Sequence, residues 1–555
     1  MFDSKQFKQQ FPIFSHPENE RLVYLDNAAT TQRPQVVVDA IADFYTRSNA
    51  NTHRSSHRLA RQATEQVEQV RARLGDWINA QRSEEIVFTR GATEALNIIV
   101  NGLAEQLQPG DEVILSTAEH HANLVPWQML VEKKQIVLRF LPELDGLPQL
   151  QQLDALVSDR TRVVSLTAAS NALGFVTPVS ELKQHLPQQA LLILDASQLL
   201  AHQSVDVQEI DCDFLVGSAH KFYGPTGIGF LYGRYKLLET MAPWQGGGEM
   251  ITRVSLQHSE YAAPPHRFEP GTSSLAAIVG LGAALRFIEG LDRAAMATYE
   301  SHLNRYLHTE LEKVVQQRPL QLLTDFKNNV GIAALVARTE CPVTVMDIGS
   351  WLDEHDIAVR VGHHCAQPLM QGLGHDGSLR ISLAAYNDRS DVDRLIQALL
   401  AMPMQVVDID VDAAESHDEL WHRDNLQGIA VEQLRAQSSW QKRYRELTRW
   451  AARLAPKPEI RVAENFVEGC ESEVWITHQK RSDGKHQFLI DTDSRVIKGL
   501  SVLLLLLVSG KTSDEILNLD FDEVFSQLGL EKYLSPSRSN GFRSLVNRIR
   551  TFAEL

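Results

Sequence analysis

The chain has 555 residues, 43% hydrophobic and 22% charged, which is typical of a soluble globular protein and too long for one ordinary core, so we expect two or three domains. The formal net charge of −16 would repel phosphate backbones and anionic membrane surfaces, which argues against general binding to nucleic acid or membranes. The polar segment Met1–Glu20 lacks the features of a secretory signal, and the apolar run Leu500–Val508 is about half the ~20 residues that cross a bilayer. We therefore expect a cytoplasmic protein without a transmembrane segment.

The first elements alternate between short apolar runs and longer helical patterns, from about residue 21 to residue 290. The runs lie at 85–88, 112–115, 162–166 and 191–194. This rhythm predicts an α/β domain with a mostly parallel sheet. From 291 to 403 a long amphipathic helix is followed by strand-like runs at 330–336 and 377–383, which predicts a smaller α+β domain that the N-terminus joins.

The chain changes character after residue 403. Acidic residues crowd the stretch 404–428 with little apolar periodicity, so we interpret it as a linker. Helical patterns at 429–454 and strand-like runs at 473–476 and 487–490 then predict a separate α+β module over 429–555, in which the run from Leu500 is a buried helix.

Four cysteines are present, at positions 212, 341, 365 and 470, and no two of them form a close pair. Neither a disulfide scaffold nor a metal site is expected. Cys212 and Cys341 sit among strand-like residues, where a packed core cysteine is the favoured interpretation.

Lys221 carries the strongest functional signal. It ends Ser218-Ala-His-Lys, after a strand-like run and before a glycine-rich turn, the setting of a lysine that holds pyridoxal 5'-phosphate covalently. Asp195 directly follows the run 191–194, a position from which a carboxylate can keep the cofactor's pyridine nitrogen protonated. Gln198 can bond the phenolic oxygen of the cofactor. Taken alone, a lysine is usually a solvated surface charge, and an aspartate after a strand is often a helix N-cap.

A phosphate site is expected where Gly91-Ala-Thr-Glu-Ala follows a strand and starts a helix, because helix N-termini attract anions. Thr93, Ser218 and His220 would add donors. His120, after another strand, can stack on the pyridine ring and exchange protons with the substrate. His121 beside it leaves open which imidazole points inward.

Residues 1–403 resemble group II cysteine desulfurases of the class V aminotransferase family, which have the fold of type I pyridoxal phosphate enzymes. The resemblance rests on stretches that occur together in the expected order: Tyr24-Leu-Asp-Asn-Ala-Ala-Thr-Thr, Gly91-Ala-Thr-Glu-Ala-Leu-Asn, Glu119-His-His-Ala-Asn, Asp195-Ala-Ser-Gln, Ser218-Ala-His-Lys, Arg360-Val-Gly-His-His-Cys and Arg380-Ile-Ser-Leu-Ala-Ala-Tyr-Asn. Ala92 stands where threonine is frequent, and Ala219 where glycine is frequent, so contacts of the phosphate loop can differ.

The resemblance implies further roles. Asn171 lies beside the cofactor and substrate, and Thr272 reaches the phosphate of the partner subunit, which implies a homodimer. Arg380 holds the carboxylate of the substrate, L-cysteine, as a bidentate partner. Lys221 then removes the α-proton, and His120 manages protons.

Cys365 is expected to take the substrate's sulfur. It lies in a loop-like stretch with glycine, proline and neighbouring histidines that can favour a thiolate. The products would be L-alanine and a persulfide on Cys365.

Cys470 lies in Gly469-Cys-Glu-Ser-Glu-Val-Trp, where its thiolate can receive that sulfur by exchange. Residues 430–555 resemble SufE-type sulfur acceptors through this stretch and through Ser439-Trp-Gln-Lys-Arg-Tyr, Arg495-Val-Ile-Lys-Gly-Leu and Leu534-Ser-Pro-Ser-Arg-Ser-Asn-Gly. The chain thus resembles a desulfurase fused to its own acceptor, with a further sulfur-accepting protein or iron–sulfur scaffold downstream.

Two alternatives remain at this point. One is selenocysteine lyase activity, with L-selenocysteine as the substrate, or another class V reaction. The other is a sulfur-carrier adaptor whose desulfurase half has decayed, against which the intact Lys221, Asp195, Cys365 and Arg380 argue. The sequence does not choose between a relay within one chain and one across a dimer.

Overall fold

The chain forms two compact units, an N-terminal unit of residues 1–404 and a C-terminal unit of residues 405–555. The computed structural model describes residues 2–52, 56–339, 341, 343–403, 420–437, 440–451, 453–467, 473–492, 495–529 and 536–554. Among the helices in these ranges, none combines the length and the apolar character that a membrane crossing requires.

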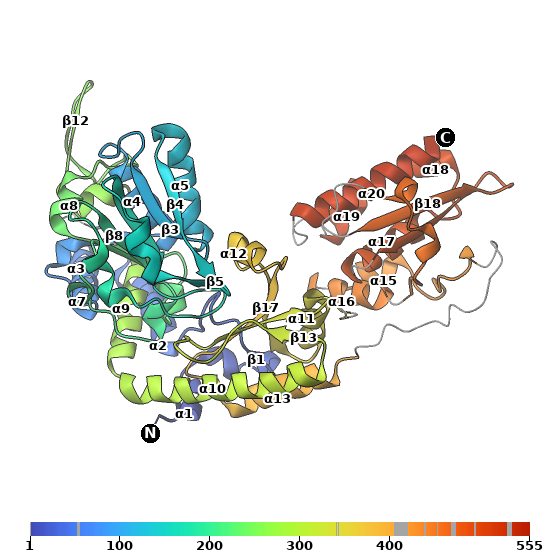
Figure 1. Ribbon diagram of the computed structural model, residues 1–555, viewed down its shortest axis with the longest axis horizontal. Helices are drawn as coiled ribbons and strands as arrows, with labels where there is room; N and C mark the ends of the chain where they lie inside the picture. The colour runs from blue at the N-terminus through green and yellow to red at the C-terminus, as the bar shows by residue number, and fades with distance from the viewer. Residues whose placement is uncertain are drawn as a thin grey trace. The chain divides into compact units, whose positions relative to one another are not determined.

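A seven-stranded sheet is the centre of the N-terminal unit (Figure 1). Its strands are, in spatial order, β2 (Ile86–Thr89), β10 (Gly229–Gly233), β9 (Phe214–Ser218), β8 (Leu191–Asp195), β7 (Thr161–Thr167), β3 (Glu112–Ser116) and β4 (Val137–Leu141). All neighbours are parallel except β10, which is antiparallel to both β2 and β9. The predicted mostly parallel α/β fold is confirmed.

Helices cover both faces of this sheet, because its central strands are apolar on both sides. On β8, Leu192 and Leu194 face one core, which includes α3 (Arg58–Trp77) and α9 (Leu275–Glu289). Ile193 faces the other, with α4 (Ala92–Leu103) and α5 (His121–Lys134). The two helix pairs flank the sheet in Figure 1. The carboxyl ends of the parallel strands are thereby left open for a site.

A second, antiparallel sheet follows, with the strand order β13 (Leu320–Leu322), β14 (Ile332–Ala337), β17 (Ser378–Ser382) and β16 (Arg360–Gly362). The predicted long amphipathic helix is α10 (Arg293–Gln317), which packs on this sheet with α11 (Val345–Glu354) and α13 (Arg389–Ala401). The N-terminus joins the same region, since β1 (Val23–Tyr24) pairs in parallel with β15 (Ile357–Ala358).

The C-terminal unit pairs a β-hairpin, β18 (Val474–Lys480) and β19 (His486–Thr492), with helices α16 (Trp440–Ala451), α17 (Arg495–Val508), α19 (Phe521–Leu528) and α20 (Pro536–Glu554). Helix α17 contains the apolar run from Leu500 and is buried along most of it, as expected. It lies so close to α16 that a Cβ on Gly499 would come within 2.2 Å of the Leu447 carbonyl oxygen. Only glycine fits there.

The predicted linker 404–428 falls partly outside the described residues. Its C-terminal part packs on the C-terminal unit, where Leu420 and Trp421 contact Ile460, Trp475 and Leu489. Residues 404–419 are not described, so the linker's boundaries stay a prediction.

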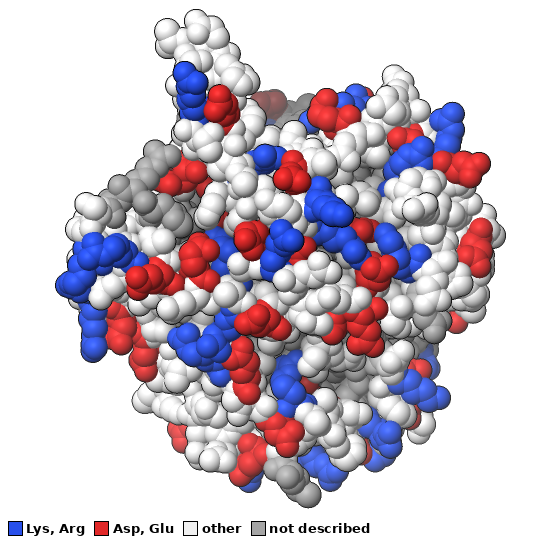
Figure 2. Space-filling model, turned by 90° about the vertical axis from the view of Figure 1, so that its left-hand side faces the viewer, with Lys and Arg blue, Asp and Glu red and all other residues white. Residues whose placement is uncertain are grey.

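Charge is distributed evenly over the side of the molecule that Figure 2 presents. Lysine and arginine side chains there alternate with aspartate and glutamate, and no large patch of one sign gathers on the face in view.

Candidate functional site

The predicted cofactor residues gather at the carboxyl ends of neighbouring strands of the large sheet, where open α/β folds place their ligands. Asp195 is the last residue of β8, and Ser218 is the last residue of β9. One turn of 3₁₀ helix (Ala219–Lys221) follows Ser218 and ends at the lysine. His120 lies four residues beyond β3, directly before α5.

Lys221 places its amine among the charged groups of the site. No side chain or carbonyl of the described residues accepts a hydrogen bond from its Nζ. Burial lowers the pKa of its ammonium group, Asp195 opposes this lowering, and Arg380 adds to it. The neutral amine, which is the nucleophilic form, is thereby favoured.

Asp195 is 6% exposed, and its Oδ1 accepts a hydrogen bond from the Ser197 amide at 3.0 Å. This local bond fixes the carboxylate at the strand end, facing the charges of Lys221 and His120, with both of which it interacts electrostatically. Gln198 is also buried, but its Nε2 donates to the Ala28 carbonyl at 2.8 Å. Its amide nitrogen is therefore already engaged by the protein.

The expected phosphate side forms where α4 begins. The Ala92 amide, at the first turn of α4, donates to Ser218 Oγ at 2.9 Å, and Thr93 beside it is exposed. The Nδ1 atom of His220 is buried, and no group of the described residues forms a hydrogen bond with it. Gly229 allows the backbones of β10 and β9 to approach each other closely here, because a Cβ on it would lie 2.5 Å from the Gly217 carbonyl oxygen.

Thr272 lies apart from this turn on an exposed loop. It lines a cavity of about 360 Å³ together with Arg90 and Glu94, which flank the start of α4. The loop thus comes near the helix start at which phosphate binding is expected in its own chain, while its reach into a second subunit stays a prediction.

His120 is held as a neutral imidazole. Its Nδ1 accepts a hydrogen bond from the Ala122 amide at 3.0 Å, which caps α5 and leaves the proton of the neutral ring on Nε2. Burial, and next the charge of Lys221, lower its pKa to about 4. At neutral pH the ring is uncharged and able to donate through Nε2.

Arg380 on β17 is 1% exposed and already paired on two sides. Its Nη1 donates to the Asn171 carbonyl at 2.8 Å, and its Nη2 donates to Asp26 Oδ1 at 2.9 Å. Its Nε is buried, and within the described part of the chain no group accepts a hydrogen bond from it. Since each Nη carries two protons, the guanidinium keeps donors for a further anion.

Cys365 lies in a loop between β16 and α12 (Gln367–Gly372) and is half-buried. Its φ of +57° and that of His364, +54°, place two successive non-glycine residues in the left-handed region. Strain of this kind is characteristic of functional sites, where surrounding bonds must hold it. Cys365 interacts electrostatically with both Lys221 and Arg380, so the thiol belongs to the same site.

Asn171 connects the Cys365 loop to the arginine. Its Nδ2 donates to the His364 carbonyl at 2.5 Å, while its own carbonyl accepts from Arg380. The side chain of His364 is buried, and its Nε2 lies 3.0 Å from Ser378 Oγ. Sequence reasoning placed Asn171 beside the cofactor but missed its role in holding the loop.

The other cysteines differ in setting. Cys212 is fully buried, and burial raises the pKa of its thiol to about 12, as suits a packed core residue. Cys341 is half-buried. Cys470 lies outside the described residues. The described residues that flank it are hydrogen-bonded to each other, since the Val467 amide donates to the Val474 carbonyl at 2.9 Å.

Glu119 is a buried group that sequence reasoning missed. It is 1% exposed, accepts hydrogen bonds from Ser116 Oγ at 2.6 Å and Asn123 Nδ2 at 2.7 Å, and has a pKa that burial raises to about 7. Its carboxyl group ties the end of β3 to the first turn of α5 and so fixes His120. The available signal was an acidic residue directly between a strand and His120.

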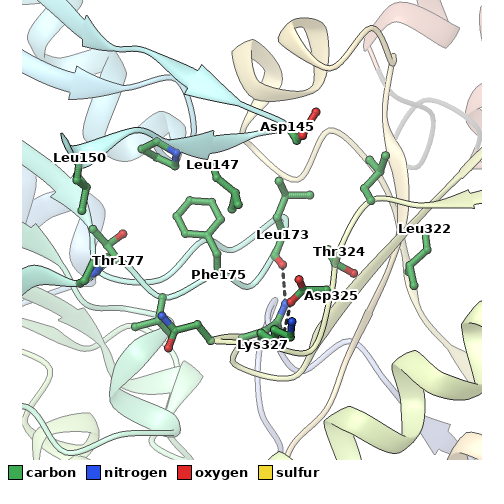
Figure 3. A pocket seen from close by; sticks show the side chains of 16 residues that line it. Asp145, Leu147, Leu150, Leu173, Phe175, Thr177, Leu322, Thr324, Asp325 and Lys327 are labelled. Atoms are coloured by element: carbon green, nitrogen blue, oxygen red, sulfur yellow. Dashed lines mark hydrogen bonds between the residues drawn. The ribbon is translucent and has the colours of Figure 1, made fainter. Parts of the chain in front are cut away.

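A separate pocket of about 580 Å³ is lined by described residues that do not include any of the predicted site residues (Figure 3). Leu173 and Phe175 line it, as do Asp325 and Lys327 from the segment between β13 and β14 (Figure 3). Asn329 Nδ2 donates to the Leu173 carbonyl at 2.9 Å, the bond drawn in Figure 3. The pocket therefore marks where the two sheets' regions join.

Two family models match the chain. The model described as aminotransferase class-V matches residues 23–395, and the model described as SufE, an Fe-S metabolism associated domain, matches residues 429–553.

The curated relatives that match most of the N-terminal unit are cysteine desulfurases. That of Serratia proteamaculans is 42% identical over 403 residues, covering 72% of this chain and 98% of the relative. That of Dickeya dadantii is 44% identical over 397 residues, covering 71% and 95%. Among solved structures, the cysteine desulfurase CsdA of Escherichia coli is 36% identical with a TM-score of 0.66, covering 72% of this chain and 98% of that one.

Proposed function

We propose a function from one premise: the chain belongs to the aminotransferase class-V family, as its cysteine desulfurase relatives do, and carries a SufE domain after it. The protein is a pyridoxal phosphate-dependent cysteine desulfurase that converts L-cysteine to L-alanine and passes the sulfur from Cys365 to Cys470. The observation that carries this proposal is the gathering of a free amine, a carboxylate and a thiol, Lys221, Asp195 and Cys365, in one site.

The residues present fit the cofactor. Among the described residues, neither Lys221 Nζ nor the buried His220 Nδ1 has a hydrogen-bond partner, and Asp195 presents a fixed carboxylate at a strand end. Lys221 would hold the cofactor covalently, and Asp195 would hold the proton on its ring nitrogen. Ser218, Thr93 and His220 would surround the phosphate, with Thr272 contributed across a homodimer. Pyridoxal phosphate, when bound, supplies an electron sink for charge that develops on the α-carbon of an amino acid.

Arg380 and Asn171 would orient the substrate. The guanidinium of Arg380 is fixed by Asp26 and by the Asn171 carbonyl, and its remaining N–H groups suit a carboxylate. Since two of its nitrogens are already engaged, the carboxylate of L-cysteine would be bound through the free N–H groups.

Lys221 and His120 would move protons. A neutral Lys221 amine, favoured by burial, accepts the α-proton of the bound amino acid. The neutral His120 ring offers its Nε2 proton toward the substrate. Both groups are near enough to Asp195 to sense its charge, so the protonation states of the three are interdependent.

Cys365 would then receive the sulfur. Its thiolate bonds to the substrate sulfur while the carbon–sulfur bond breaks, and the three-carbon fragment leaves as L-alanine after protonation. Cys470 attacks the outer sulfur of the Cys365 persulfide, which regenerates the Cys365 thiol. A tether raises the effective acceptor concentration into the millimolar range.

The sulfur on Cys470 would pass to a downstream protein for iron–sulfur cluster assembly or another sulfuration. Because both relay thiols must stay reduced, we place this function in the cytoplasm. The relatives' names give cysteine, not selenocysteine, as the substrate to test first.

Replacement of the lysine tests the proposal. The protein incubated with pyridoxal phosphate should show the visible absorbance of a lysine-bound cofactor and release alanine from L-cysteine, whereas Lys221→Ala should show neither. Lys236→Ala, a lysine on α8 (Tyr235–Thr240), serves as the control and should keep both. Alanine release by Lys221→Ala at the wild-type rate would refute the proposal.

A further inference from the structure

The first residues of two helices exchange hydrogen bonds around Cys365. His121 is the first residue of α5, and its main-chain N–H donates to the Cys365 carbonyl at 2.7 Å. Gln367 is the first residue of α12, and its main-chain N–H donates to the ring Nε2 of His121 at 3.2 Å. Because the first amides of a helix have no partner within it, each helix start is satisfied by the other segment.

This arrangement brackets the strained loop. Cys365 and His364 both have a left-handed backbone, a strained conformation that non-glycine residues keep only where surrounding contacts enforce it. On one side the loop is held by Asn171 Nδ2 at the His364 carbonyl. On the other side His121 provides two bonds, one from its backbone and one at its ring.

We propose that His121 is a positioning residue that holds the Cys365 loop in its strained conformation through the hydrogen bond that its ring accepts from Gln367. The proposal deepens the proposed function and rests on it where turnover is concerned. His121 itself does not touch the reacting atoms. It acts through the position of the Cys365 thiol relative to the substrate's sulfur.

The ring bond depends on the protonation state of His121. Nε2 of His121 accepts the hydrogen bond from Gln367 only while it carries no proton. In a protonated ring, the Nε2–H group would face the main-chain N–H of Gln367, and no hydrogen bond could form. Burial lowers the pKa of His121, and His363, whose ring centroid lies 5.7 Å away, lowers it further. His120, whose ring centroid lies 6.4 Å away, is the second titratable ring beside it among the described residues, and it is neutral at neutral pH. The loop is therefore held at neutral pH and released on acidification.

Three variants separate the ring acceptor from the rest of the residue. His121→Ala removes the acceptor, and His121→Gln offers a side-chain oxygen that cannot be protonated in this range. His302→Gln, at an exposed histidine on α10, is the matched control. The measurements are hydrogen–deuterium exchange of residues 363–370, corrected for intrinsic exchange at each pH, and steady-state alanine release as a function of L-cysteine concentration.

Loss of one hydrogen bond corresponds to about a tenfold change in an equilibrium constant or a rate constant. For His121→Ala we expect about tenfold faster exchange and about tenfold lower kcat, with the KM for L-cysteine within about twofold of wild type. His121→Gln should match wild type and His302→Gln at pH 8, but should lack the loss of protection that the wild type shows on acidification.

Wild-type protection of residues 363–370 in His121→Ala would overturn the proposal, as would exchange in His121→Gln as fast as in His121→Ala. If His121→Ala does not fold, the comparison of wild type with His121→Gln across pH decides. If the chain released no alanine at all, the proposed function would fail, yet the exchange measurement would still decide whether His121 holds the loop.

Discussion

Glu119 illustrates how a single buried side chain can prepare a site that it does not enter. Glu119 directly precedes His120 in the chain, is 1% exposed, and has a carboxyl group hydrogen-bonded to Ser116 and Asn123. Burial raises its pKa to about 7, because a charge there is poorly solvated. The free energy of unfolding should therefore depend on the protonation of this residue.

The pH dependence has a definite sign. The folded pKa of Glu119 exceeds the ordinary value of 4.5, so its contribution to stability is complete below about pH 4.5 and is lost as the pH rises through about 7. Between pH 5 and pH 8 this loss amounts to about 2 kcal/mol. Glu119→Gln cannot ionise and should remove that part of the pH dependence in urea unfolding. An unchanged pH dependence in the variant would contradict the raised pKa.

Cys365 and Cys341 form a matched pair for a second test, since both are half-buried cysteines of the N-terminal unit. Cys365→Ser should keep the visible absorbance of the bound cofactor but lose at least a hundredfold in alanine release, because an alcohol is a far weaker nucleophile toward sulfur. Cys341→Ser should retain activity. Equal activity of the two variants would show that Cys365 does not receive the sulfur.

Much of the site was predictable at the residue scale because strand ends and sequence motifs identify it. Asp195, Ser218 and Lys221 follow apolar runs, and the structure places them together. The sequence could not indicate which groups accept hydrogen bonds from the side-chain amides. The side-chain amide of Gln198 donates to the Ala28 carbonyl, and that of Asn171 donates to the His364 carbonyl. Both bonds join segments that are distant in the chain.

At the scale of elements, an ion pair connects α3 to Glu269, a loop residue that is also bonded to β2. Arg71 is 1% exposed and donates from both Nη atoms to Glu269, at 2.7 and 2.9 Å. Glu269 also accepts from the Phe88 amide on β2 at 2.7 Å. Since Glu269 lies just before the loop of Thr272, this pair positions that loop.

Replacement of Arg71 alone should leave the buried carboxylate of Glu269 without the guanidinium that compensates its charge. Arg71→Met is expected to lower the free energy of unfolding by about 3 kcal/mol, and adding Glu269→Gln should restore a substantial part of the loss. Urea unfolding of the three proteins measures both effects. If the double variant is no more stable than Arg71→Met, the pair does not carry the interaction that its geometry indicates.

The elements themselves were more predictable than their edges. The apolar runs at 112–115 and 191–194 became β3 and β8, because strands covered on both faces have continuous apolar sequences. The antiparallel β10 within the sheet carries no local signal in the sequence, since its direction depends on pairing with β2 and β9. The packing of residues 420–421 on the C-terminal unit was hidden by the acidic composition around them.

At the scale of the whole molecule, two functions lie on one chain, and the relay between them is the central proposal. Sulfur should move from Cys365 to Cys470, so Cys470→Ser should still release alanine slowly when a small reductant removes the Cys365 persulfide. It should load no sulfur on the C-terminal unit. Comparable loading in Cys470→Ser and wild type would refute the relay.

Mass mapping of persulfides after a single turnover with L-cysteine tests the account most directly. We expect the wild-type chain to carry added sulfur on the Cys365 and Cys470 peptides, Cys470→Ser to carry it on Cys365 alone, and Cys365→Ser to carry it on neither. Sulfur on Cys470 in the Cys365→Ser variant, or on neither cysteine in the wild type, would contradict the account.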